Sequence, residues 1–313
     1  MIKVCFLPMS GNKCKPPARL TPGFSGVWDT IQGTDDPKEA DYFVVLEKGP
    51  THFLESFSKD PERKNKVFCF PQEPNAVSKH KNYNKYKFKY TFDYNTHHHF
   101  LNALFFMGGS YDSYASLEYP EKTKLCSVIM SKKTMIRGHK ARTNFLKDFC
   151  QKYPNVADVY GHGWNSKILG SSYKGGLSNG NCEGRPTKYD GLINYHYSIC
   201  CENNTEKNVF SEKLTDAFLC WTIPIFFGCS NIGDFFPKDS FYQFDPTDPE
   251  APAKVREILN KPVTEENIKA LKIARELCLN RYNIWPSIER LVQHVESGSS
   301  EKYNMFRYID EQS

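Results

Sequence analysis

The sequence has no long apolar run and no large excess of charge of one sign. No stretch approaches the roughly 18 apolar residues that a membrane-spanning helix requires, and the residues after Met1 do not resemble a signal peptide. The 41 basic and 36 acidic residues give a net charge of only +5, much less than a dedicated nucleic-acid binder carries. We therefore expect no membrane span in this chain and no nucleic-acid partner.

The cysteines show no metal-binding or redox spacing. There are 11 of them, but no two form a C-x-x-C pair, and most lie inside apolar segments. An odd number without a secretory signal favours buried, reduced thiols over a disulfide framework. The consecutive histidines from His97 to His99 cannot all face one ion from a regular element. We expect no structural disulfides and no bound metal.

Short apolar segments alternate with polar connections along the chain. In the first half they include 3–7 and 40–46, which have the pattern of buried strands. In the second half, strand-like segments at 125–130 and 156–160 flank a segment with helical spacing at 141–153. This alternation predicts an α/β fold, and 313 residues are enough for two domains.

Three other segments carry weaker structural expectations. Segment 26–31 is expected to be a short helix, and segment 163–186, rich in Gly, Ser and Asn, a long surface loop. Segment 79–90 interleaves lysines with aromatic residues, a pattern found in single-strand nucleic-acid binders. It also fits a half-buried strand with a lysine-rich polar face, which we favour.

The densest group of chemically capable residues comes after a strand-like segment that ends near position 201. Glu202 and Asn203 come first, and Ser211 then caps a helix whose first turn holds Glu212 and Lys213. A helix N-terminus attracts anions through its free N–H groups and its dipole, and the lysine adds a full charge. Carboxylates suit ribose or sugar hydroxyls, so the group predicts a sugar-nucleotide pocket at the carboxyl ends of strands. An ordinary capped surface helix is the alternative, because Glu–Lys pairs are common on helices.

The order and spacing of these residues resemble the signature of the α-1,3/1,4-fucosyltransferases, glycosyltransferase family ten. Four ordered elements carry the resemblance: Glu202-Asn203-Asn204, Ser211-Glu212-Lys213, the segment 221–228 (WTIPIFFG), and Pro237 with Ser240 and Phe241. The chain departs from the family in having Val209-Phe210-Ser211 in place of Tyr-Val-Thr, and Asn204 in place of Ser. The missing tyrosine leaves recognition of the base or sugar open.

Residues upstream extend the resemblance. Ser131, then Arg142 with Phe145, resemble the family's Ser-Asn loop and its Arg-x-x-Phe element, and Tyr160-Gly161 resembles its Tyr-Gly element. The resemblance implies that Arg142 and Lys213 bind the diphosphate of the donor in place of a metal ion. It implies a donor site that also includes Glu212, Asn203, Glu202, Ser131, Ser211 and Gly161.

A weaker resemblance concerns the catalytic base. Gln72-Glu73-Pro74 resembles the family's Glu-Ser-Pro stretch, whose glutamate is the base. An inverting displacement needs a carboxylate near the acceptor hydroxyl, on the face opposite the leaving group. The resemblance implies Glu73 in this role, and a loop-start glutamate held by Pro74 is the alternative.

The resemblance also implies an architecture and a reaction. The fold would be of GT-B type, α/β, with two Rossmann-like domains facing across a cleft: an acceptor-side domain at 1–122, a donor domain at 123–262, and helices at 263–313 that pack back on the first domain. The reaction would transfer L-fucose from GDP-fucose to a hydroxyl of a glycan acceptor with inversion and without a metal cofactor.

Alternatives remain at this level. The same fold could use another donor, such as a UDP-sugar, because the sequence does not reveal the base pocket. A non-catalytic carbohydrate- or nucleic-acid-binding module is an alternative of another class. The resemblance implies a cytoplasmic enzyme of bacterial or viral type, or a trimmed catalytic domain of a Golgi-type enzyme.

Overall fold

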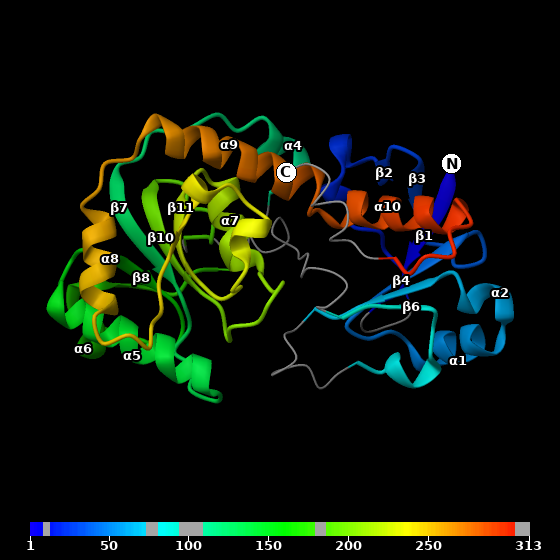
Figure 1. The fold of residues 1–313 in the computed structure, drawn as a ribbon, viewed down its shortest axis with the longest axis horizontal. Coiled ribbons are helices and arrows are strands. Elements are labelled where there is room, and N and C mark those ends of the chain that lie inside the picture. The colour runs from blue at the N-terminus through cyan, green and yellow to red at the C-terminus, as the bar shows by residue number, and fades with distance from the viewer. Residues whose placement is uncertain (9–12, 73–80, 94–108, 179–185, 304–313) are drawn as a thin grey trace. The chain divides into compact units, whose positions relative to one another are not determined.

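The computed structural model describes residues 1–8, 13–72, 81–93, 109–178 and 186–303. The chain divides into two compact units, shown in Figure 1. Unit 1 comprises 1–101, 110–112 and 282–313, and unit 2 comprises 102–109 and 113–281. This division differs in position from the boundaries at 122 and 262 that the sequence suggested.

Unit 1 is built on a six-stranded sheet in the order β2-β3-β1-β4-β5-β6. All neighbouring strands are parallel except β2 and β3, which pair antiparallel. The strands are β1 (Ile2–Phe6), β2 (Val27–Trp28), β3 (Ile31–Thr34), β4 (Tyr42–Leu46), β5 (Val67–Phe70) and β6 (Tyr90–Thr91). Segment 26–31, expected to be a helix, instead forms the β2–β3 hairpin, with Asp29 at a positive φ of 43°.

The helices of unit 1 bury large apolar side chains against this sheet. In α1 (Thr51–Lys59), Phe57 packs 4.3 Å from Phe43 of β4, measured between ring centroids. In α10 (Ile284–Glu296), the buried Trp285 lies 5.2 Å from Phe6 of β1. The short α2 (Pro61–Lys64) comes directly after α1 and buries no side chain, and α4 (Tyr111–Ala115) belongs partly to each unit.

Segment 79–90, expected to be a half-buried strand, is mostly not a strand in its described part. Residues 84–86 form a 3-10 turn, and only Tyr90 and Thr91 pair as β6. Lys87 has a left-handed φ of 52°, which interrupts an extended chain. Residues 79 and 80 lie outside the described residues.

Unit 2 contains a second six-stranded sheet, in the order β12-β11-β10-β7-β8-β9, with every neighbouring pair parallel. The strands are β7 (Lys124–Ile129), β8 (Asp158–Tyr160), β9 (Tyr173–Gly175), β10 (Tyr195–Cys201), β11 (Ile223–Phe227) and β12 (Tyr242–Gln243). The helices are α5 (Arg137–Lys152), α6 (Ser166–Leu169), α7 (Glu212–Leu219), α8 (Ala251–Leu259) and α9 (Glu265–Asn280). Two mainly parallel sheets, one in each unit, confirm the α/β fold class, whereas a cleft between the domains stays a prediction.

The predicted β-α-β unit at 125–160 is confirmed by β7, α5 and β8. The segment expected to be a long loop at 163–186 is only partly irregular. Asn165 caps α6 by accepting a hydrogen bond from the Ile168 N–H, and β9 then joins the sheet at its edge. The sequence did not predict α6 and β9, because a four-residue helix and a three-residue strand are too short to show a hydrophobic period.

The strand order of the second sheet contains a switch point. β7 pairs with β8 on one side and with β10 on the other. Helix α5 comes after β7 and helix α7 after β10, so the chain enters both helices from the carboxyl edge of neighbouring strands. In open parallel sheets, ligands bind outside the carboxyl ends of the strands where the order reverses. Ligand-binding residues are therefore expected in segments 130–142 and 201–213.

Candidate functional site

A buried carboxylate stands at the end of β10. Glu202 is 3% exposed, and its Oε1 accepts hydrogen bonds from the backbone N–H of Ser211 at 2.8 Å and from the Ser211 hydroxyl at 2.6 Å. A Cβ atom at Gly228 would overlap the Glu202 side chain. Only glycine therefore fits beside this carboxylate at the end of β11.

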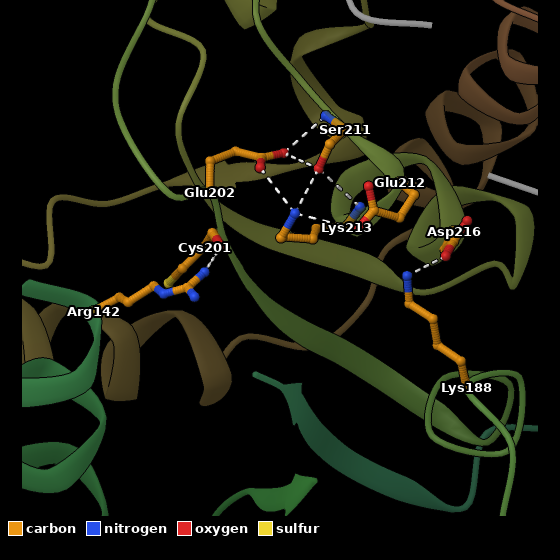
Figure 2. Close-up of polar contacts among 8 residues, drawn as sticks. All are labelled: Arg142, Lys188, Cys201, Glu202, Ser211, Glu212, Lys213 and Asp216. Atoms are coloured by element: carbon orange, nitrogen blue, oxygen red, sulfur yellow. Dashed lines mark hydrogen bonds and ion pairs between the residues drawn. The ribbon is translucent and has the colours of Figure 1, made fainter. Parts of the chain in front are cut away.

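Ser211 connects that carboxylate to the first turn of α7. Its hydroxyl caps the helix by accepting the backbone N–H of Lys213 at 3.4 Å. The ammonium of Lys213 lies 2.9 Å from the Ser211 hydroxyl, 3.3 Å from Glu202 and 3.2 Å from Glu212, as Figure 2 shows. The geometry thus brings these four residues together, as the sequence predicted.

The protonation state of Lys213 depends on these neighbours. Burial alone would lower its pKa, but the carboxylates of Glu202 and Glu212 outweigh burial and raise the pKa well above its ordinary value. The ammonium therefore stays charged at any physiological pH. It is a fixed cation at the N-terminus of a helix.

Arg142 reaches the same strand end from α5. The residue is 3% exposed, and its Nη1 donates to the carbonyl of Cys201 at 3.1 Å. Its Nε has no hydrogen-bond partner among the described residues. Burial lowers the pKa of the guanidinium, with Cys201 and Glu202 opposing, yet an arginine remains protonated. A buried cation with a free donor is suited to an anionic ligand.

Ser131 and Gly161 lie at the ends of the neighbouring strands β7 and β8. A Cβ atom at Gly161, whose φ is +150°, would overlap the carbonyl of Met130. This glycine lets the two strand ends close together, and the backbone N–H of Lys132 then donates to the carbonyl of His162 at 2.9 Å. The carbonyl of Ser131 accepts from the backbone N–H of Lys133 at 2.9 Å. The structure gives Ser131 and Gly161 backbone roles, and their direct ligand contacts stay predictions.

One neighbour of Arg142, His139, is absent from the donor residues that the sequence predicted. His139 is buried one helical turn before Arg142. Burial lowers the pKa of its ring, and the nearby Asn203 side chain opposes this shift. A Cβ atom at Gly138 would overlap the carbonyl of Asn203, so the start of α5 touches the chain that leaves β10. The helix predicted from the sequence began at 141, so it did not include 139; in the structure both 139 and 142 lie on α5.

A buried ion pair lies under α7. Lys188 contacts Asp216, which is fully buried three residues after Lys213. Burial raises the pKa of Asp216 to about 7, although Lys188 opposes this. One of the two carboxylate oxygens has no partner among the described residues, so little compensates the charge on that side. No sequence signal marked Lys188, which belongs to an irregular segment.

The predicted base Glu73 lies outside the described residues. The chain just before it is held by a residue that the sequence did not indicate. Glu47, buried at the end of β4 with a left-handed φ of 58°, accepts the backbone N–H of Gln72 at 2.6 Å. Glu47 therefore anchors the entry to the segment that carries Glu73.

A comparison with known families matches part of the second unit. Residues 119–265 match the model of the carboxyl-terminal domain of glycosyltransferase family 10, the fucosyltransferases. This segment, slightly less than half of the chain, is similar to the fucosyltransferases of family 10. The matched segment contains every candidate donor residue from Ser131 to Lys213, so this family domain holds the cluster at the end of β10. No curated protein sequence matches the chain significantly.

Similarity to solved structures is weaker. An α1,3-fucosyltransferase crystallised with GDP is 14% identical, with 97% of this chain and 92% of that chain covered and a TM-score of 0.43. A glycosyltransferase from Rickettsia africae is also 14% identical. The match covers 87% of this chain and 77% of that chain, with a TM-score of 0.45. TarM is 12% identical. The match covers 80% of this chain and 54% of that chain, with a TM-score of 0.46. The similarity to family 10 therefore rests on the match at residues 119–265.

Two further properties concern only the part of the chain that the structure describes. In that part no helix is both long and apolar enough to cross a lipid bilayer. In the same part no three His, Cys, Asp or Glu side chains are grouped so that they could hold a metal ion. Metal independence of the reaction stays a prediction.

Proposed function

We propose that this glycosyltransferase transfers L-fucose from GDP-fucose to a hydroxyl of a glycan acceptor, with inversion at the anomeric carbon and without a metal ion. The family match to fucosyltransferases supports the sugar. The observation that carries the chemistry is the convergence of Arg142 and Lys213 on the end of β10. Two fixed cations there suit a diphosphate.

The leaving group is the first requirement of the reaction. As the bond between the sugar and the diphosphate breaks, negative charge grows on the departing GDP. Arg142 and Lys213 stabilise that charge without reorganising, because the burial of Arg142 and the hydrogen bonds of both side chains already hold them in place. The Nε of Arg142 and the N-terminal N–H groups of α7 are the donors that a diphosphate oxygen would meet.

The acceptor is the second requirement. In a single displacement, its hydroxyl attacks the anomeric carbon from the side opposite GDP while a base removes the hydroxyl proton. We assign that role to Glu73. Glu47 supports the assignment indirectly, because its carboxylate holds the backbone of Gln72, the residue before the base.

Glu212 and Asn203 are assigned to the donor's hydroxyls. Glu212 lies in the first turn of α7 and shares Lys213 with Glu202. A carboxylate already facing a lysine can still accept hydrogen bonds from sugar or ribose hydroxyls with its remaining lone pairs. Glu202 is committed to Ser211 and Lys213, so we assign it a positioning role.

Calorimetric titration tests the donor. The purified chain is titrated in EDTA with GDP, GDP-fucose, UDP and UDP-glucose, and again with added Mg²⁺. We expect selective binding of the guanine nucleotides, unchanged by EDTA. Selective binding of UDP compounds would keep the glycosyltransferase domain and overturn the donor, whereas a strict need for Mg²⁺ would overturn the metal-free mechanism.

Transfer itself needs a separate assay. GDP release from GDP-fucose is followed with a panel of galactose- and N-acetylglucosamine-containing glycans, and the anomeric configuration of the product is read by NMR. A change of configuration relative to the donor would support inversion. Binding of GDP-fucose without turnover on any glycan, combined with binding of glycans or oligonucleotides, would favour a non-catalytic module.

A further inference from the structure

His139 is buried beside the candidate diphosphate site without a full set of partners. The side chain is 4% exposed, and neither ring nitrogen makes a well-formed hydrogen bond with any described residue. The Asn203 side chain is the one hydrogen-bonding group whose proximity affects the ring. One amide can face one ring nitrogen, so the other is left without a partner among the described residues. A buried polar group in this state costs free energy, which a ligand can recover.

The fold aims this ring at the end of β10. His139 and Arg142 are three residues apart on α5, so both project from the same face of the helix. Arg142 meets the carbonyl of Cys201, and the backbone of Gly138 lies against the carbonyl of Asn203. The first turn of this 16-residue helix is therefore pressed against the site, where its dipole favours an anion.

The charges around His139 come from three elements. Burial is the largest influence and lowers the pKa of the ring, and the cations Arg142 of α5, Lys133 of the preceding loop and Lys213 of α7 lower it further. Asn203 opposes them. The carboxylates of Glu202 and Glu212 pair with Lys213. Burial and the neighbouring cations therefore favour the neutral form of the imidazole.

We propose that His139 is a third ligand of the donor diphosphate, beside Arg142 and Lys213, and that it takes up a proton when the diphosphate binds. The inference rests on the proposed function, since it concerns the same sugar nucleotide. The two negative charges of the diphosphate, close to the ring, favour the protonated imidazole, whereas the neighbouring cations alone favour the neutral form. The protonated ring then donates one hydrogen bond to a phosphate oxygen and can keep Asn203 at its other nitrogen.

A packing role predicts something different. A histidine that only fills space between α5 and the end of β10 would bind no proton when the nucleotide arrives. Its replacement would lower the stability of the fold without altering the pH dependence of binding. Proton uptake therefore separates the two roles.

The experiment uses the full chain and GDP-fucose, whose diphosphate has no ionisation of its own near neutral pH. Binding is measured by calorimetry at pH 6.5, in EDTA, in buffers with different enthalpies of ionisation. The slope of the observed enthalpy against the buffer enthalpy gives the number of protons taken up. We expect uptake of a large fraction of one proton by the unmodified chain.

Two variants complete the test. His139→Gln, which keeps an amide donor of similar size, is expected to bind GDP-fucose roughly tenfold more weakly and to show no proton uptake. His162→Gln removes an exposed histidine at the end of β8 and is the matched control, with unchanged affinity and unchanged uptake. His139→Asn is a second replacement if His139→Gln fails to fold.

The outcomes are distinguishable from those of the donor test. If the unmodified chain binds GDP-fucose with no proton uptake, or if His139→Gln keeps both affinity and uptake, the inference on His139 is overturned and the proposed function stands. If the chain binds UDP-glucose and not GDP-fucose, the donor is wrong, and the same titration with UDP-glucose decides the role of His139. If no sugar nucleotide binds, both proposals fail.

Discussion

The carboxyl edges of the two sheets differ in the residues that come after the strands. In unit 2, a buried glutamate comes directly after β10 and pairs with Lys213 of α7, while the buried Arg142 of α5 donates to the carbonyl of Cys201. In unit 1, the residues at the ends of β1 and β5 are apolar and buried, and Glu47 uses its carboxylate on a backbone N–H. Parallel sheets of the same size thus host different chemistry, because function lies in the residues beyond the strand ends.

The helix starts show the same contrast. Ser211 caps α7 with its hydroxyl and is itself bonded to Glu202, so the cap belongs to the candidate site. Pro50 precedes α1 and makes no side-chain cap, and α1 packs its apolar side on the sheet through Leu54 and Phe57. The start of α7 thus contributes to the candidate site, whereas the start of α1 serves packing.

The largest expected effect concerns Lys213. Lys213→Met removes a diphosphate cation and leaves Glu202 as an unpaired buried charge, which costs about 3–5 kcal/mol of stability. Nucleotide affinity is expected to fall more than about 100-fold. Chemical denaturation and calorimetry measure the two effects. In Lys213→Met combined with Glu202→Gln, stability should recover in part and affinity should not; recovery of affinity would show that the cation does not bind the ligand.

Gly161 tests how tightly the edge of the second sheet is closed. Gly161→Ala forces a Cβ atom onto the carbonyl of Met130 and is expected to cost about 3 kcal/mol. Gly23→Ala in unit 1 is the matched control, since Gly23 has a φ of 61° but open space around it, and should cost only about 1 kcal/mol. Urea denaturation measures both. Equal costs would mean that the strand ends can separate freely.

Glu47 tests whether the edge of unit 1 serves catalysis and not donor binding. Glu47→Gln weakens the anchor on Gln72, so we expect kcat for fucose transfer to fall about tenfold, roughly 1.4 kcal/mol in the barrier, while GDP affinity is unchanged. Glu39→Gln, which alters an exposed partner of Lys3, is the control and should change neither. A loss of GDP affinity in Glu47→Gln would contradict the division of roles.

The smallest expected effect is a pH dependence from Asp216. Burial raises its folded-state pKa to about 7, above the value of 3.8 for the free group, so the native state binds more protons than the unfolded state between these values. Stability therefore falls as the pH rises from about 4 to 7, and we expect about 1 kcal/mol over that window because Lys188 offsets part of the shift. Thermal denaturation of the Asp216→Asn variant across this range should show a flatter profile. An unchanged slope would assign the dependence to another group.

Much of the fold could be predicted from local patterns. The apolar segments that became β1, β4, β7 and β10 are short and bounded by turn residues, and Ser211 indicated the start of α7. The short elements α6 and β9 and the β2–β3 hairpin were not predicted, because they are too brief to show a period and depend on pairing with strands elsewhere in the sheet.

By itself the sequence determined which side chains could bind an anion and where helices would present them: Lys213 after a capping serine, and Arg142 on an amphipathic helix. Only the tertiary structure decided that His139 and Asn203 meet, that Lys188 pairs with Asp216, and that Glu47 holds Gln72. The members of each pair lie between 25 and 64 positions apart in the sequence. Contacts over such separations depend on how strands, helices and loops pack together in the folded chain, and no local pattern encodes that placement.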